Sequence, residues 1–171
     1  YRADVRGIAE TADGSIWIGM RGGGVARCLG TNITQFRKAE GLPHDYVWAL
    51  AAGDGGDLWI GTAGGGLGRW RAGQFSSITS RNGLPSNFFC SIQRDTEGNL
   101  WVGSYGGIFR MTQEELERFF TGKAFSVTPL VLDTTDGLPS LEMSGGNQPA
   151  SCRTADGRLW FASAGGLVVV D

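Results

Sequence analysis

The side chains with the greatest potential for chemistry follow three copies of a Gly-Leu-Pro segment. In chain order these residues are His44-Asp45-Tyr46, Ser86-Asn87-Phe88 and Ser140-Leu141-Glu142. An imidazole beside a carboxylate suits acid–base chemistry, but no Ser, Cys or second carboxylate is tied to His44 by spacing. The same pair makes a weak zinc site, because such sites gather three or four ligands. Varied polar and aromatic side chains on a constant frame are instead typical of a binding surface.

We therefore predict a ligand-binding face, with no catalytic and no metal-ligating residues. The loops that carry glycine clusters are expected to add side chains to those after Gly-Leu-Pro. The candidate ligand-binding residues are Arg21, His44, Asp45, Tyr46, Asn87, Phe88, Tyr105, Glu142, Asn147 and Gln148. The alternative for each residue taken singly is structural, because Pro and a following Ser, Asp or Asn also make turns.

Other kinds of site find little support in the sequence. Calcium is conceivable at Asp13, Asp95, Glu97 and Asp156, but a two-residue hairpin turn needs Asp-Gly for its backbone angles alone. The glycine clusters match neither a dinucleotide-binding fingerprint nor a P-loop, so we expect no cofactor. With 15 Lys and Arg against 17 Asp and Glu, the formal charge is −2, which does not favour a nucleic-acid or membrane-surface partner. No stretch approaches the roughly 18 apolar residues of a membrane-spanning helix.

The elements that must position these loops are repeated along the chain. Tryptophan-centred segments recur at spacings of 42, 42 and 59 residues, at Trp17, Trp59, Trp101 and Trp160. Each follows a Gly-bearing turn and precedes a second glycine cluster. The run Leu58-Trp59-Ile60 is apolar on consecutive residues, which predicts a strand covered on both faces. We therefore expect the four tryptophans to pack between neighbouring sheets and to have a structural role.

Four short strands in about 42 residues are typical of one β-propeller blade. In the second unit we expect strands at 47–52, 57–62, 67–71 and 75–79. The sequence thus predicts an all-β fold: a single β-propeller segment, 1–171, of about four four-stranded antiparallel blades. The expected blades span about 4–40, 41–82, 83–136 and 137–171, and the outer strand of the fourth is expected to be missing.

The third blade carries an insert at 112–122. Thr112 and Glu115 have the spacing of a capping box before an apolar pair, which predicts a short helix there. In a blade whose strands run up and down, the loop after the second strand and the loop before the first share one end. We therefore expect the glycine clusters and the Gly-Leu-Pro segments on one face, and the Asp-Gly turns on the opposite face.

Residues 83–87, 95–103 and 106–110 read Gly-Leu-Pro-Ser-Asn, Asp-Thr-Glu-Gly-Asn-Leu-Trp-Val-Gly and Gly-Gly-Ile-Phe-Arg. This pattern resembles the two-component regulator propeller repeat and differs from the WD40 repeat, which lacks the Leu-Trp-Val-Gly core. The resemblance covers essentially the whole chain in four copies. It implies the extracytoplasmic, periplasmic input region of a bacterial histidine kinase, hybrid two-component protein or diguanylate cyclase. Glycans are the ligand class that it implies for some members.

We accordingly expect a non-enzymatic sensory segment that binds a glycan or small molecule on the Gly-Leu-Pro face. Two alternatives remain: a propeller lyase or hydrolase whose turnover depends on His44, and a scaffold that binds only a protein partner. Family propellers usually have more than four blades. We therefore expect either the remaining blades of a parent protein or self-association, for example two chains in an eight-bladed ring.

Overall fold

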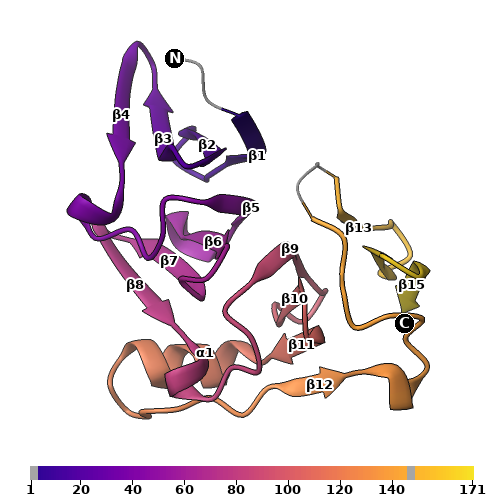
Figure 1. Ribbon diagram of the computed structural model, residues 1–171. Helices are drawn as coiled ribbons and strands as arrows, with labels where there is room; N and C mark the ends of the chain where they lie inside the picture. Colours follow the sequence, from indigo (N-terminus) through magenta and orange to yellow (C-terminus); the bar gives the residue numbers. More distant parts are fainter. Residues whose placement is uncertain (1–3, 146–148) are drawn as a thin grey trace.

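The computed structural model describes residues 4–145 and 149–171, which form four small sheets arranged in an arc (Figure 1). The sheets follow one another in chain order, from the indigo sheet at one end of the arc to the yellow sheet at the other. Every neighbouring pair of strands is antiparallel, and strands that are consecutive in the chain are neighbours in their sheet. The prediction of an all-β propeller segment is therefore confirmed.

The strand bounds fix the size of each blade. The first blade holds β1 (Asp4–Glu10), β2 (Ile16–Arg21), β3 (Gly24–Leu29) and β4 (Asn32–Phe36). The second holds β5 (Val47–Ala52), β6 (Leu58–Thr62), β7 (Leu67–Arg71) and β8 (Gln74–Ile78). The third holds β9 (Phe89–Arg94), β10 (Leu100–Ser104), β11 (Gly107–Met111) and β12 (Leu130–Leu132). The fourth holds three strands within the described residues: β13 (Ser151–Arg153), β14 (Leu159–Ser163) and β15 (Gly166–Val170).

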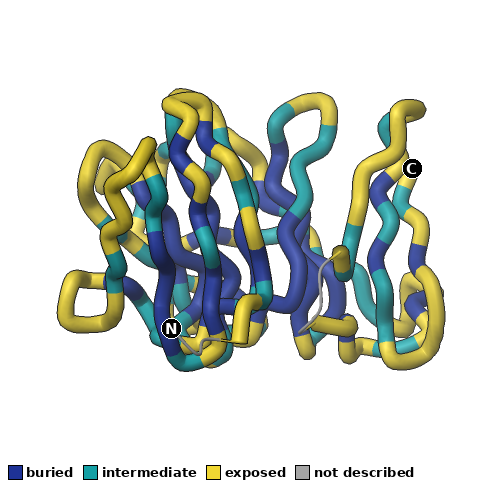
Figure 2. The backbone as a smooth tube through the Cα atoms, turned by 90° about the horizontal axis from the view of Figure 1, so that it is seen from above, coloured by how far each residue is buried: buried dark blue, intermediate teal, exposed yellow. Residues whose placement is uncertain are grey.

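The first strand of each blade lies nearest the axis of the arc, and the fourth strand lies at its rim (Figure 1). Strand β5 contacts both β1 and β9, and β9 contacts β13. In a view turned by 90° from Figure 1, the buried residues lie mainly along the middle of the strands, while the loops at both ends are mostly exposed (Figure 2). The molecule therefore offers two loop faces and an inner wall formed by the first strands.

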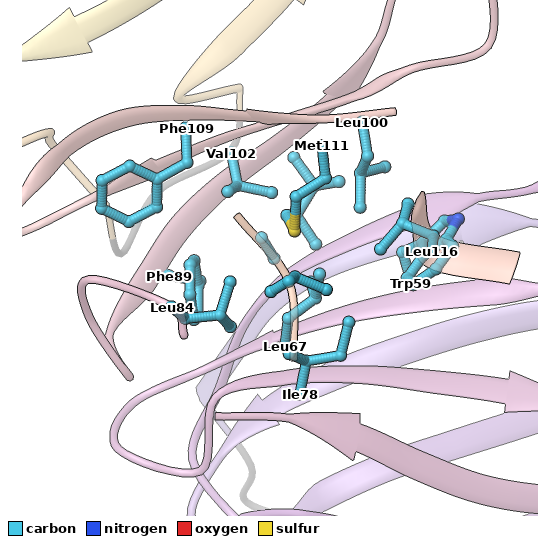
Figure 3. Close-up of a cluster of buried hydrophobic side chains, with 13 residues drawn as sticks. Trp59, Leu67, Ile78, Leu84, Phe89, Leu100, Val102, Phe109, Met111 and Leu116 are labelled. Atoms are coloured by element: carbon cyan, nitrogen blue, oxygen red, sulfur yellow. The ribbon is translucent and has the colours of Figure 1, made fainter. Parts of the chain in front are cut away.

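The core lies between neighbouring blades. At the junction of the second and third blades, the buried side chains come from both sheets and from the insert (Figure 3): Trp59, Leu67, Ile78, Leu84, Phe89, Leu100, Val102, Phe109, Met111 and Leu116. Trp17, Trp59 and Trp101 are each buried at successive junctions, whereas Trp160 in the last sheet is half-buried. A sheet whose strands are apolar on both faces is thus stable because its neighbours cover both faces.

The insert forms a helix, α1 (Gln113–Phe120), between β11 and β12. The Thr112 hydroxyl caps it by accepting the Glu115 backbone N–H at 3.2 Å. The predicted capping box is only half formed, because the Glu115 carboxylate accepts the backbone N–H of Thr128 instead. That contact holds the segment after the helix against its first turn.

Helix α1 also docks on the second blade. The Glu117 carboxylate accepts a hydrogen bond from the Arg69 guanidinium at 2.7 Å, and Arg69 donates to Asp57 at 2.8 Å. Arg69 is only 2% exposed, and its guanidinium carbon lies 4.9 Å from the centre of the Phe120 ring. The Phe120 ring in turn lies 5.8 Å from the Trp59 ring. The insert of the third blade is therefore clamped to the second blade by a buried, charge-assisted contact.

Glycine is required in the loop that joins the second and third strands of each of the first three blades. Gly66 has φ of +82°, and a Cβ atom there would lie 2.2 Å from the Ile78 carbonyl oxygen. Gly24 and Gly107 have the same left-handed backbone, with corresponding approaches of 2.1 and 2.3 Å. Any side chain at these positions would push the third and fourth strands apart.

We expect Gly66→Ala to destabilise the protein strongly. Gly73→Ala is the matched control, because Gly73 has φ of +87° with nothing within 4 Å of a built Cβ. The control should cost about 1 kcal/mol of left-handed backbone strain, and Gly66→Ala should cost about 1–3 kcal/mol more because it adds a clash. Urea unfolding of both variants measures the difference, and equal costs would contradict the packing argument.

Candidate functional site

The Gly-Leu-Pro segments and the glycine clusters lie on one face, as the up-and-down strand order predicts. Arg21 at the end of β2 forms an antiparallel bridge with Tyr46, and Ala63 forms one with Phe88. The Gly107 N–H donates to the Leu141 carbonyl at 2.9 Å at the next junction. We call this end of the molecule the Gly-Leu-Pro face.

The first residue after each Pro closes a turn. The Nδ1 atom of His44 accepts the backbone N–H of Tyr46 at 3.0 Å. The Ser86 hydroxyl accepts the backbone N–H of Phe88 at the same distance, and the third copy repeats this contact at 3.1 Å. His44 therefore closes its turn in the same way as Ser86 does. Because Nδ1 accepts a hydrogen bond, a neutral His44 ring carries its proton on Nε2.

The second residue after the Pro is used within its own loop. Asp45 Oδ1 accepts the Lys38 backbone N–H at 2.9 Å, and Asn87 Oδ1 accepts the Ser80 backbone N–H at 2.8 Å. Lys38 and Ser80 begin the 3₁₀ turns η1 (Lys38–Glu40) and η3 (Ser80–Asn82). These two candidate residues thus fix the shape of the loop and hold its neighbours in place.

The third position after the Pro points its side chain outward. Phe88 is 42% exposed and stacks on Tyr105, which is 46% exposed, with ring centres 5.8 Å apart and planes 5° from parallel. The Trp48 ring lies 5.7 Å from Tyr105 and 6.4 Å from Phe88. We call these three residues the aromatic platform. It joins the second blade, through Trp48, to the third.

Trp48 is not among the predicted site residues, because its place in the platform depends on a β-bulge. The pairing of β5 with β6 shifts register between Val47 and Ala49, so Trp48 is an extra residue on the inner strand. The inner strands β1 and β9 shift register at Arg6 and Cys90, both 42 residues away from Trp48. A bulge re-aims one side chain. An alignment of the 42-residue repeats indicates this position, because it holds a different residue type in each copy: Arg6, Trp48 and Cys90.

Trp48 also lines a hollow of about 810 Å³ along the inner wall of the arc. The hollow continues past β5 and β9 to the opposite face, where Arg94 Nη1 donates to Asp54 at 2.8 Å. Its wall is polar in between, where Gln93 Nε2 donates to the Ser151 carbonyl at 3.0 Å. The platform stands at the Gly-Leu-Pro end of this hollow.

Burial and charge shape the chemistry beside the platform. Burial raises the pKa of the Cys90 thiol to about 12, with a smaller contribution from the Glu142 carboxylate. Burial also raises the pKa of Tyr105, and the charges at Cys90 and Glu142 act in the same direction. Cys90 is therefore a protonated, weakly nucleophilic thiol at neutral pH.

The candidate residues separate into two groups on this face. Arg21, His44 and Tyr46 lie at the junction of the first two blades, where the His44 and Tyr46 rings are 5.6 Å apart. Phe88, Tyr105 and Glu142 lie nearer the third and fourth blades. Asn147 and Gln148 lie outside the described residues. Across residues 4–145 and 149–171, no three His, Cys, Asp or Glu side chains gather as metal ligands would.

Comparison with known proteins identifies the repeat. Residues 41–64 and 83–106 match the family model described as two component regulator propeller. These two stretches are two-component regulator propeller repeats, and they make up 48 of the 171 residues. Each matched stretch begins at a Gly-Leu-Pro segment and ends in the glycine cluster after the second strand. Together the two repeats contain all three residues of the aromatic platform.

Solved structures share the fold of these propeller repeats. An extracellular domain described as that of the hybrid two component system BT3049 from B. thetaiotaomicron has a TM-score of 0.78 and 23% identity over 97% of this chain. That of the one component system BT4673 from the same organism has 0.72 and 20% over 98%. Virginiamycin B lyase from Staphylococcus aureus has 0.62 and 15% over 98%. The chain spans 21%, 23% and 55% of these chains, respectively.

No curated protein sequence matches the propeller repeats of this chain. In the part of the chain that the structure describes, no helix has the length and apolar character needed to cross a membrane.

The aspartate of the propeller repeat is a structural acceptor on the opposite face. Asp95 Oδ1 accepts the Asn99 backbone N–H at 2.8 Å, and Oδ2 accepts the Trp101 indole N–H at 2.9 Å. In the first blade, Thr11 takes the place of Asp95 and accepts the Trp17 indole N–H at 3.1 Å. Partial burial tends to raise the pKa of Asp95, but these hydrogen bonds outweigh it and the pKa is lowered. The Asp-Gly turn thereby anchors the inter-blade tryptophan.

We expect Asp95→Asn to reduce the free energy of unfolding by about 1 kcal/mol at pH 7, because charge-assisted hydrogen bonds are lost. The lowered pKa means that the unfolded chain binds the proton first, near its usual value of about 3.9. The stability that Asp95 contributes is therefore present above pH 4 and lost as the pH falls through the folded value. Urea midpoints at pH 7, 4 and 3 should show a shallower acid loss in the variant, and an unchanged slope would contradict this role.

Proposed function

We propose that this chain is a non-enzymatic sensory segment of an extracytoplasmic, two-component-type signalling protein, and that it binds a ligand on the Gly-Leu-Pro face. The proposal rests on one observation: all three residues of the aromatic platform lie in the two stretches that match the family repeat. Trp48 lies in the matched stretch 41–64, and Phe88 and Tyr105 lie in 83–106. The likeness to extracellular domains of two-component systems supports the same assignment.

The geometry suits binding. Exposed aromatic rings held together at a surface mark interaction sites, because ligand contact removes a large apolar area from water. The Phe88 loop is held by its own hydrogen bonds, so little conformational entropy is lost when a ligand docks. Sugar rings present C–H faces that stack on such rings, and a glycan is the ligand class that we propose.

The platform also suggests how binding becomes a signal. Trp48 belongs to the second blade, whereas Phe88 and Tyr105 belong to the third. A ligand that contacts all three favours one relative position of these blades. Such a preference between two states is what a sensor needs, because a ligand shifts an equilibrium only by its differential affinity.

A lyase or hydrolase is the main alternative, because virginiamycin B lyase shares the fold. We favour the sensory role because His44 uses Nδ1 within a turn that Ser forms in the other copies. Cys90, the buried thiol near the platform, is held protonated by its raised pKa. Within residues 4–145 and 149–171, no hydrogen bond joins either side chain to a second group as a nucleophile and base would be joined.

We expect Phe88→Ala to abolish ligand stabilisation while leaving the fold intact. Phe125→Ala is the matched control, because Phe125 lies between α1 and β12 and is 90% exposed. The readout is the melting temperature with a panel of neutral, acidic and amino disaccharides and small aromatic compounds. At least one class should stabilise the parent chain and the control, with affinity for the Phe88 variant reduced at least tenfold. Equal stabilisation of both variants would place the site elsewhere.

We propose that this chain also self-associates through the two ends of the arc. Val5 and Ile8 of β1 are 50% and 57% exposed, whereas Val47 and Leu50, 42 residues later, are 0% and 5% exposed. Leu167 of the last sheet is 64% exposed, whereas its counterpart Leu67 is fully buried. At the junctions within the chain, a neighbouring blade buries the residues equivalent to Val5, Ile8 and Leu167. The first blade of one copy is therefore suited to cover the last blade of another.

Native mass spectrometry at micromolar concentration tests this association. We expect a dimer of twice 18.2 kDa, with a shift to the monomer in Ile8→Glu because a charge would be buried at the interface. Phe125→Glu should leave the protein a dimer. A monomeric mass for the unaltered chain would refute the proposal.

A further inference from the structure

The segments that surround the aromatic platform carry a single formal charge at neutral pH. Residues 46–50, 63–66, 86–91, 104–107 and 139–145 contain no Lys, no Arg and one carboxylate, Glu142. Cys90 and Tyr105 lie in the same segments, but both have raised pKa values and are uncharged at neutral pH. The platform is therefore an apolar surface with one negative group.

Backbone hydrogen bonds place Glu142 next to the platform. The Gly107 N–H donates to the Leu141 carbonyl at 2.9 Å, and the Met143 N–H donates to the Ser104 carbonyl at 3.0 Å. Glu142 is thus held between two contacts that flank Tyr105 and Gly106. Its side chain is exposed, and no salt bridge among the described residues involves it.

Both features favour a cation over an anion. The face of an aromatic ring attracts an ammonium group through its quadrupole, and a carboxylate adds a direct Coulomb attraction. An anionic group on the same ligand would instead meet Glu142, and these segments offer no basic side chain to offset the repulsion.

We propose that the aromatic platform and Glu142 form one subsite for a sugar ring that bears a protonated amine. The inference rests on the proposed ligand-binding function and deepens it by naming an amino sugar as the ligand class. The ring stacks on Phe88 and Tyr105, and the ammonium group lies toward Glu142. Among the described residues, no hydrogen bond uses the Trp48 indole N–H or the Tyr105 hydroxyl, so both groups are available to sugar hydroxyls.

Calorimetric titration with three disaccharides tests the proposal. The probes are a glucosamine disaccharide with free amines, its fully N-acetylated counterpart and a disaccharide that contains a uronic acid. We expect the free amine to bind at least tenfold more tightly than the acetylated sugar, and the acidic sugar to bind weakest. Glu142→Gln should abolish the difference between the first two sugars. Glu114→Gln, which removes the same charge from the exposed start of α1, should retain it.

The outcomes separate this inference from the proposed function. Equal affinity for the amino and acetylated sugars, with both weakened by Phe88→Ala, would overturn the charge selection and leave a ligand-binding platform. Tighter binding of the acidic sugar would overturn it in the same way. Failure of all three sugars to bind at millimolar concentration would overturn the amino-sugar assignment, while stabilisation by a non-sugar compound that depends on Phe88 would still support the sensory function.

Discussion

Every sheet in this molecule must be covered on both faces, and the remaining features depend on that constraint. The strands are too short and too apolar to stand alone, so each blade is stable because tryptophan and aliphatic side chains of the next one pack against it. The close approach at Gly24, Gly66 and Gly107 allows the sheets to keep this shape in each copy. Once the frame is fixed by burial, the side chains at the loop ends are released from packing and can differ between blades.

That division explains the character of the Gly-Leu-Pro face. Asp45 and Asn87, which are polar at the same position of two copies, bond within their own loops. Residues that change type from blade to blade, such as Arg6, Trp48 and Cys90, occupy one bulged position on the inner strand. The frame therefore supplies equivalent sites with different chemistry, and on the Gly-Leu-Pro face the junction of the second and third blades carries the three rings of the aromatic platform.

Much of the fold could be predicted from the sequence, because the 42-residue spacing and the Leu-Trp-Ile pattern are local signals of strands buried on both faces. Predicted strands 47–52 and 67–71 match β5 and β7, the prediction 57–62 begins one residue before β6, and the prediction 75–79 is shifted by one residue from β8. Part of the site could also be predicted, since Phe88 and Tyr105 follow from loop positions. Trp48 could not, because a bulge depends on pairing with another strand. The docking of α1 could not either, since Arg69 and Glu117 are 48 residues apart.

The clamp made by α1 has a mechanical consequence. Asp57 and Arg69, with Glu117, fasten the second and third blades together at the end of the strands that carries the Asp-Gly turns. The platform spans the same two blades at the other end. The two blades are also joined at that other end, where the Gly64 and Gly66 backbone N–H groups donate to the Asn87 carbonyl at 2.9 and 3.2 Å. Any rearrangement of the second blade against the third must therefore break hydrogen bonds at one end of the strands or the other.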